Sequence, residues 1–107
     1  MALVILYFMF EGQEESPVVA DIEQIPARFR AAILSDIGRV AEYGFKSPVS
    51  MKSIKGHSPM FEIRTGGYRT FFVMDRNEMW ILHCCKKDDQ RRGIEVADER
   101  MRMVLER

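Results

Sequence analysis

The pattern of apolar and polar positions predicts short elements along the whole chain, beginning with a strand. Residues 1–10 are almost entirely apolar and run directly into acidic residues. They lack the basic segment and small-residue cleavage site of an export signal, and they are too few to span a membrane. Ser16 and Pro17 then start a helix, because a serine oxygen caps orphan N–H groups and proline is tolerated at the first helical position. This helix is predicted to reach about Ile25.

A second, longer helix is predicted from Pro26 to about residue 43. Its apolar residues recur at steps of four, four and three, and a glycine follows where a helix C-cap often has one: Phe29, Ile33, Ile37, Val40 and Gly44. Residues 45–59 read as a loop, since they contain two prolines and a glycine. The apolar face of the helix predicts that it packs on a sheet.

Three strands and a final helix complete the predicted order. The strands cover about 60–65, 68–74 and 79–85, and turn residues separate them. A helix over about 94–106 is indicated by apolar residues at helical spacing. The order β, α, α, β, β, β, α predicts an α+β fold, with the helices on one face of a mainly antiparallel sheet. The chain is long enough for a single domain over residues 1–107.

The turn between the last two strands decides which side chains share a face. A three-residue turn with Asn77 left-handed would place Met74 opposite Glu78 and Arg69 opposite His83. A two-residue turn of Arg76 and Asn77 would shift the register by one and send His83 to the other face. The first register favours a site that contains both Arg69 and His83.

Charge is distributed unevenly, although the formal net charge is zero. Residues 1–50 hold 4 Lys and Arg against 7 Asp and Glu, whereas residues 51–107 hold 12 against 9. Nine basic residues lie between Lys52 and Arg92, among strands that need apolar side chains on at least one face. A small sheet with one basic face is a place where phosphates bind.

The cysteine and histidine content gives no metal-binding pattern. Cys84 and Cys85 are adjacent on a predicted strand, so their side chains point to opposite faces and a disulfide between them is not expected. We interpret them as reduced, buried thiols of a cytoplasmic protein. No cofactor and no metal are predicted.

The order of motifs in the second half resembles the RelE/ParE toxin superfamily, specifically its phage-derived, HigB-like branch. The resemblance rests on a Lys-Gly loop, a Glu-x-Arg strand, a Tyr-Arg strand start, a Leu-His pair and a Lys-Lys pair before the closing helix: Lys55 and Gly56, Glu62 and Arg64, Tyr68 and Arg69, Leu82 and His83, Lys86 and Lys87. It implies a RelE-like fold and the toxin of a type II toxin–antitoxin pair. The implied activity is metal-free, ribosome-dependent cleavage of mRNA, with mRNA, the ribosome and a helix-turn-helix antitoxin as partners and no membrane.

The resemblance also implies catalytic roles. It places Arg69 on the scissile phosphate, where a guanidinium binds two oxygens at once. Arg64 is a second candidate and shares a strand face with Glu62, because the two residues are two positions apart. Lys87 falls where RelE-type relatives have an arginine that acts on the phosphate. His83 suits acid–base chemistry, although a lone strand histidine is also typical of a hydrogen-bonded core position.

Five further cations are candidates for nucleic-acid binding: Lys52, Lys55, Lys86, Arg91 and Arg92. Structural alternatives stay open, since Arg69 could pair with Glu62 across the sheet and the two lysines could end a solvated strand. RelE-type enzymes have two lysines where this chain has Met60 and Glu62, and the chain lacks their tyrosine after the basic pair. Proton transfer would therefore depend on Glu62, His83 or the Lys52/Lys55 loop.

Two other functions are compatible with the resemblance. A ParE-like chain would inhibit DNA gyrase by binding, with its effect on the helices and not on the Arg64, Arg69 and Lys87 face. A phage-derived protein that only binds a partner would have dispensable basic groups and would be harmless without an antitoxin.

Overall fold

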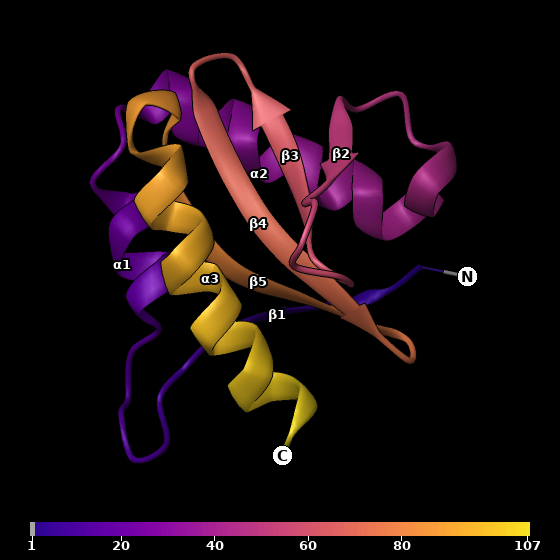
Figure 1. The fold of residues 1–107 in the computed structure, drawn as a ribbon. Coiled ribbons are helices and arrows are strands. Elements are labelled where there is room, and N and C mark those ends of the chain that lie inside the picture. Colours follow the sequence, from indigo (N-terminus) through magenta and orange to yellow (C-terminus); the bar gives the residue numbers. More distant parts are fainter. Residues whose placement is uncertain (1) are drawn as a thin grey trace.

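The computed structural model describes residues 2–107 and forms a five-stranded sheet with helices packed against it (Figure 1). Met1, at the start of the first predicted strand, lies outside the described residues. Two 3-10 turns, Gly44–Lys46 and Lys87–Asp89, follow α2 and β5. The elements in chain order are β1 Val4–Tyr7, α1 Pro17–Glu23, α2 Ala27–Tyr43, β2 Met51–Ser53, β3 Phe61–Thr65, β4 Tyr68–Asp75, β5 Glu78–Lys86 and α3 Gln90–Leu105.

The strand order across the sheet is β1-β5-β4-β3-β2. The meander of β2 to β5 is antiparallel, whereas β1 lies parallel to β5. The α+β class and the mainly antiparallel sheet predicted from the sequence are therefore confirmed. Parallel strands need a long connection between them, and for β1 and β5 this connection contains α1, α2 and the first three strands of the meander.

The helices lie on both faces of the sheet, so the prediction that they share one face is wrong. Tyr68 packs against Phe29 of α2, with ring centroids 5.6 Å apart. Phe71, three residues further along β4, lies under Gly93 of α3. Since side chains three apart on a strand point in opposite directions, α2 and α3 cover opposite faces, as Figure 1 shows. Both faces of the central strands are apolar, which is why a helix can cover each.

The turn between β4 and β5 is the two-residue alternative. Asp75 is paired with Glu78, and the positive φ of 60° falls on Arg76, so the three-residue turn with a left-handed Asn77 does not form. A bulge then shifts the register, because Phe72 pairs with Ile81 whereas Phe71 pairs with His83. The bulge adds one residue to β5 and returns His83 to the face of Arg69, although the direct partner of Arg69 is Cys85.

Local sequence signals explain the element boundaries. The Ser16 hydroxyl accepts hydrogen bonds from the N–H groups of Val18 and Val19 and donates one to the Phe8 carbonyl at 2.6 Å, so it caps α1 and ties it to β1. Two elements differ from prediction: β2 lies within the predicted loop, and α3 begins four residues earlier, at Gln90. This earlier start places the first turn of α3 over the sheet.

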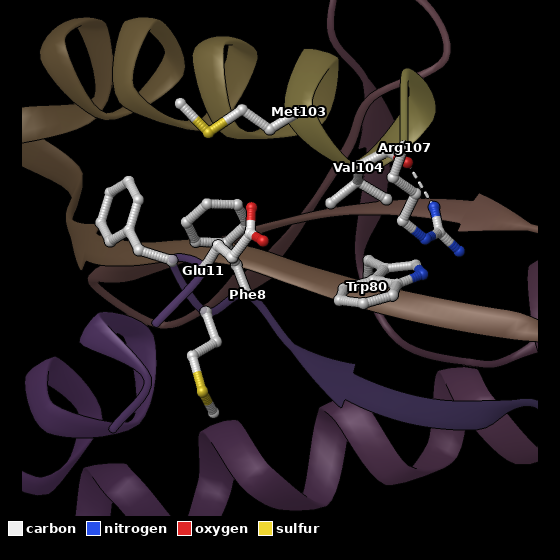
Figure 2. A pocket seen from close by; sticks show the side chains of 8 residues that line it. Phe8, Glu11, Trp80, Met103, Val104 and Arg107 are labelled. Carbon is white, nitrogen blue, oxygen red and sulfur yellow. Dashed lines mark hydrogen bonds between the residues drawn. The ribbon is translucent and has the colours of Figure 1, made fainter. Parts of the chain in front are cut away.

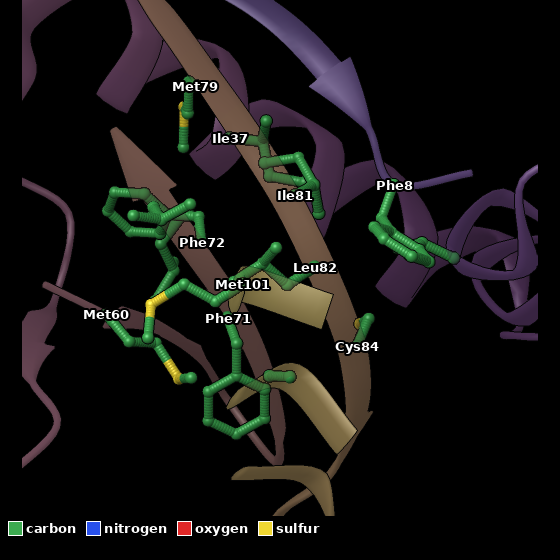
Figure 3. Packing of buried hydrophobic residues seen from close by; sticks show 14 of the residues in the cluster. Phe8, Ile37, Met60, Phe71, Phe72, Met79, Ile81, Leu82, Cys84 and Met101 are labelled. Atoms are coloured by element: carbon green, nitrogen blue, oxygen red, sulfur yellow. The ribbon is translucent and has the colours of Figure 1, made fainter. Parts of the chain in front are cut away.

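The core fills the space between the sheet and the helices. Phe71, Phe72 and Ile81 are fully buried in the centre of the sheet, and Ile37 of α2 and Met101 of α3 belong to the same core (Figure 3). Burial of such side chains contributes about 1.5–3 kcal/mol each. The two packed faces hold the ends of β3, β4 and β5 rigidly beside the start of α3, where the polar residues gather.

Candidate functional site

A buried carboxylate organises the polar cluster at this end of the sheet. Glu62 on β3 is fully buried, and its Oε1 accepts a hydrogen bond from Nε of Arg64 at 2.8 Å. Its Oε2 accepts from Nε2 of Gln90, in the first turn of α3, at 2.7 Å. The Arg64 side chain remains 40% exposed. The carboxylate thus fixes Arg64 at the surface, while both of its own oxygens are engaged.

Arg69, the first candidate for the phosphate, lies opposite Arg64 on β4 and is only 7% exposed. Its Nη1 donates to the carbonyls of Gly66 and Tyr68, each at 2.9 Å, and not to Glu62. Its Nε is buried and has no partner within residues 2–107. In this conformation Arg69 braces the β3–β4 turn, and its buried Nε–H is left without an acceptor.

Exposed cations lie on the elements that neighbour the Glu62–Arg64 pair. Lys52 on β2 is exposed and lies directly opposite Glu62. Lys55 and Arg91 line a hollow of about 440 Å³ between the β2–β3 loop and the start of α3, together with Ile54, His57, Gln90, Ile94 and Glu95. Gln90 therefore connects the hollow to the Glu62–Arg64 pair. Basic groups from three elements converge here.

His83 belongs to a different hollow. It lies beneath Gly93 of α3 and lines a space of about 500 Å³ on the α1 side, with Asp21, Lys86 and Asp89 among its neighbours. The two hollows share no lining residue in the described part of the chain. Burial lowers the pKa of His83, and Arg100 lowers it further, so the ring is neutral at pH 7. Within residues 2–107, no hydrogen bond and no shared hollow links His83 to Arg64.

The remaining predicted cations lie at the rim. Lys86 and Lys87 are exposed at the end of β5, and both line a hollow of about 350 Å³ with Phe29 and Tyr68. The backbone N–H of Lys87 donates to the Gly67 carbonyl at 2.8 Å, which holds the lysine pair beside the β3–β4 turn. Arg92 is exposed in the first turn of α3. These groups extend the basic surface around the turn.

Both cysteines are free thiols. Cys84 is buried, and burial raises its pKa. Burial raises the pKa of Cys85 to about 12, and the nearby thiol and carboxylates act in the same direction. Neither thiol is therefore activated as a nucleophile.

Residues 2–107 hold no group of three His, Cys, Asp or Glu side chains placed to bind a metal ion. No helix in that range is long and apolar enough to cross a membrane.

Two polar contacts of this region had no signal in the sequence. Nδ1 of His57 lies 2.9 Å from Oδ1 of Asp98, which joins the β2–β3 loop to α3 across 41 positions, and Gln90 reaches Glu62 across 28. Only the fold brings such residues together.

An apolar hollow lies at the other end of α3. Phe8, Trp80, Met103 and Val104 line it, and the Arg107 guanidinium lies 4.8 Å from the Trp80 ring centre (Figure 2). None of the predicted site residues lines this hollow.

The model of the family described as Phage derived protein Gp49-like (DUF891) matches residues 20–102, most of the chain. The chain belongs to the Gp49-like family. No curated protein sequence matches the Gp49-like chain. The phage-derived family and the RelE-like fold expected from the sequence are confirmed.

Three solved structures are similar to the Gp49-like chain. A RelB–RelE antitoxin–toxin complex from Methanococcus jannaschii contains a chain that is 19% identical, with a TM-score of 0.60, covering 69% of this chain and 88% of that one. The RelBE2 toxin–antitoxin complex of Mycobacterium tuberculosis contains a chain that is 17% identical, with a TM-score of 0.62, and the match covers 80% of this chain and 99% of that one. The RelE–RelB complex of Pyrococcus horikoshii contains a chain that is 15% identical, with a TM-score of 0.62, and the match covers 81% of this chain and 97% of that one. At these identities the likeness establishes the fold.

Proposed function

We propose that this Gp49-like chain is the toxin of a type II toxin–antitoxin pair, of the HigB-like branch, and that it cleaves mRNA on the ribosome without a metal ion. The family and the RelE fold support the toxin role. The observation that carries the cleavage proposal is the exposed Arg64, held by the buried Glu62, with further exposed cations on the neighbouring β2, the β2–β3 loop and α3.

Arg64 is the better phosphate ligand in this conformation. Its Nε is occupied by Glu62, which leaves the terminal nitrogens of an exposed guanidinium free to bind the oxygens of a pentavalent phosphate. Arg69 is buried beside Arg64 and donates to backbone carbonyls. In this conformation its charge can stabilise a bound phosphate electrostatically, but its guanidinium does not contact the phosphate directly unless the turn opens. We assign Arg64 to the scissile phosphate and Arg69 to supporting it.

The exposed cations give the RNA a backbone-binding surface. Lys52 lies opposite Glu62 on the neighbouring strand, Lys55 and Arg91 line the hollow that Gln90 also lines, and Lys86, Lys87 and Arg92 lie between the end of β5 and the first turn of α3. Contacts to phosphate oxygens position a nucleic acid without reading its sequence, which suits a chain that acts on messages held in the ribosome. Glu62 has both oxygens engaged and serves as a positioning residue and not as a base.

The same surface suits an antitoxin. A cytoplasmic helix-turn-helix antitoxin with an acidic segment would cover these cations and block access to Arg64. The similar solved structures from Methanococcus jannaschii and Pyrococcus horikoshii are complexes of RelE with RelB.

The proposal is tested by inducing the wild-type chain and two variants in a bacterial host and following growth and the 5′ ends of messages. Arg64→Gln removes the charge but keeps an amide N–H that can donate to Glu62. Arg39→Gln, at an exposed position of α2, is the matched control for loss of one cation. We expect growth arrest with new message ends for wild type and Arg39→Gln, and about a 100-fold lower cleavage rate for Arg64→Gln.

Two results would count against this function. Arrest with intact messages would indicate another target, such as DNA gyrase. The absence of arrest for wild type would indicate a partner-binding protein without toxicity.

A further inference from the structure

We propose that His57, oriented by Asp98, is the general base that activates the ribose 2′-OH. This inference rests on the proposed function, because it assigns a proton acceptor to the same cleavage reaction. The candidates derived from the sequence do not fill this role: Glu62 is buried with both oxygens bonded, and His83 lies in a separate hollow. The cleavage reaction still requires a proton acceptor.

The backbone of His57 is fixed on both sides. Its N–H donates to the Ile54 carbonyl at 3.1 Å, and its carbonyl accepts from the Met60 N–H at 2.9 Å. These bonds close the loop between β2 and β3, and Met60 is fully buried at its end. The histidine is therefore held on a rigid support, as catalytic geometry demands.

Asp98 fixes the orientation and tautomer of the ring. Its Oδ1 lies 2.9 Å from Nδ1 of His57, and its Oδ2 accepts from Nη2 of Arg102 at 2.8 Å. An ionised carboxylate only accepts hydrogen bonds, so Nδ1 donates to it, and in the neutral ring the lone pair is then on Nε2. This is the relation between a catalytic histidine and its orienting carboxylate.

The ring is open to a substrate and next to phosphate-binding groups. The His57 side chain is 33% exposed and lines the hollow that also contains Lys55 and Arg91. Gln90 lines the same hollow and donates to Glu62, the carboxylate that holds Arg64. A nucleotide in this hollow would thus have its ribose near His57 and its phosphate near the cations.

The proposed cleavage step needs only side chains of this protein and no cofactor. Nε2 of His57 takes the proton of the 2′-OH while the 2′ oxygen forms a bond to phosphorus. The bond between phosphorus and the 5′ oxygen breaks, and that oxygen takes a proton from the ammonium group of Lys55. The products are a 2′,3′-cyclic phosphate and a 5′-OH, and exchange with water restores both side chains.

The alternative is that His57 only tethers its loop to α3, and substitution separates the two roles. Asn at position 57 can place an amide N–H near the position of Nδ1 and donate to Asp98, but it cannot accept a proton at neutral pH. His57→Asn thus retains the tether and removes the base. Asp98→Asn is the second variant, because it removes the charge that fixes the tautomer while keeping an acceptor oxygen.

The test measures single-turnover cleavage of a defined message on purified ribosomes, together with thermal unfolding of each variant. We expect His57→Asn to lower the cleavage rate by about 10²–10⁴-fold with little change in Tm, and Asp98→Asn to lower it at least about tenfold. If wild type cleaves and both variants cleave within about twofold of it, the base assignment is wrong and the function stands. If wild type itself fails to cleave, the proposed function has failed instead.

Discussion

Gly93 of α3 lies where the helix approaches the sheet most closely, so replacing it with alanine tests the position of the helix over the site. A Cβ at position 93 would lie 2.7 Å from Sγ of Cys85, 3.0 Å from Cε2 of Phe71 and 3.3 Å from Cδ2 of His83. The first two contacts are well inside normal van der Waals separation. Phe71 is fully buried and cannot yield without moving its neighbours.

The expected change in the free energy of unfolding is the sum of two opposing effects. Alanine is favoured over glycine in a helix interior by about 1 kcal/mol, whereas overpacking a core costs about 1–3 kcal/mol. Gly38 of α2 supplies the matched control, because a Cβ there meets no atom within 4 Å. Gly38→Ala should therefore stabilise the protein by about 0.5–1 kcal/mol. Gly93→Ala should be about 1–3 kcal/mol less stable than Gly38→Ala.

Urea unfolding and thermal unfolding of the two variants measure this difference. A gap of 1–3 kcal/mol corresponds to a Tm difference of roughly 4–12 °C for a chain of this size. Because Sγ of Cys85 is the nearest atom, adding Cys85→Ala should recover at least about 0.5 kcal/mol of the loss. Equal stabilisation by both alanines would show that α3 does not pack on the Phe71 face, and the placement of Gln90 over Glu62 would fall with it.

Three further outcomes follow from particular contacts. Ser16→Ala removes a helix cap and a hydrogen bond to Phe8, and should lower the free energy of unfolding by about 1–2 kcal/mol in urea titrations; a change below about 0.3 kcal/mol would contradict the capping role. Glu62→Ala should cost about 2–4 kcal/mol in the same assay, since it leaves two donors without their acceptor and opens a cavity, while Glu62→Leu should cost less. At pH 8 iodoacetamide should alkylate Cys85 at least about 100-fold more slowly in the native protein than in urea, because burial raises its pKa to about 12 and the thiolate is the reactive form; equal rates would show that the thiol is exposed.

The sequence predicted the elements whose periodicity is strong. The apolar spacing from Phe29 to Val40 matches α2, and the turn residues Gly66 and Gly67 separate β3 from β4 as predicted. β2 has three residues and only one apolar side chain, so no pattern distinguished it from a loop. The sequence did not predict the start of α3 at Gln90, because the first turn of this helix is polar and contains Gly93. Glycine disfavours a helix unless packing requires it.

The candidate site was predictable only where its residues are neighbours in sequence. Glu62 and Arg64 share a face because they are two apart, and they do form an ion pair. The relation of Arg69 to His83 depended on a bulge in β5, which no turn residue marked. Contacts between distant segments, such as His57 with Asp98, need the folded chain because both partners are common surface residues.

Cleavage of messages on the ribosome can be measured with the purified protein, a defined mRNA and a purified translation system. We expect cleavage when ribosomes are present, with products that carry a 5′-OH and a 2′,3′-cyclic phosphate. We also expect that Arg64→Gln leaves the message largely intact while Arg39→Gln cleaves it like wild type. An intact message with the folded wild-type chain would contradict the proposed function.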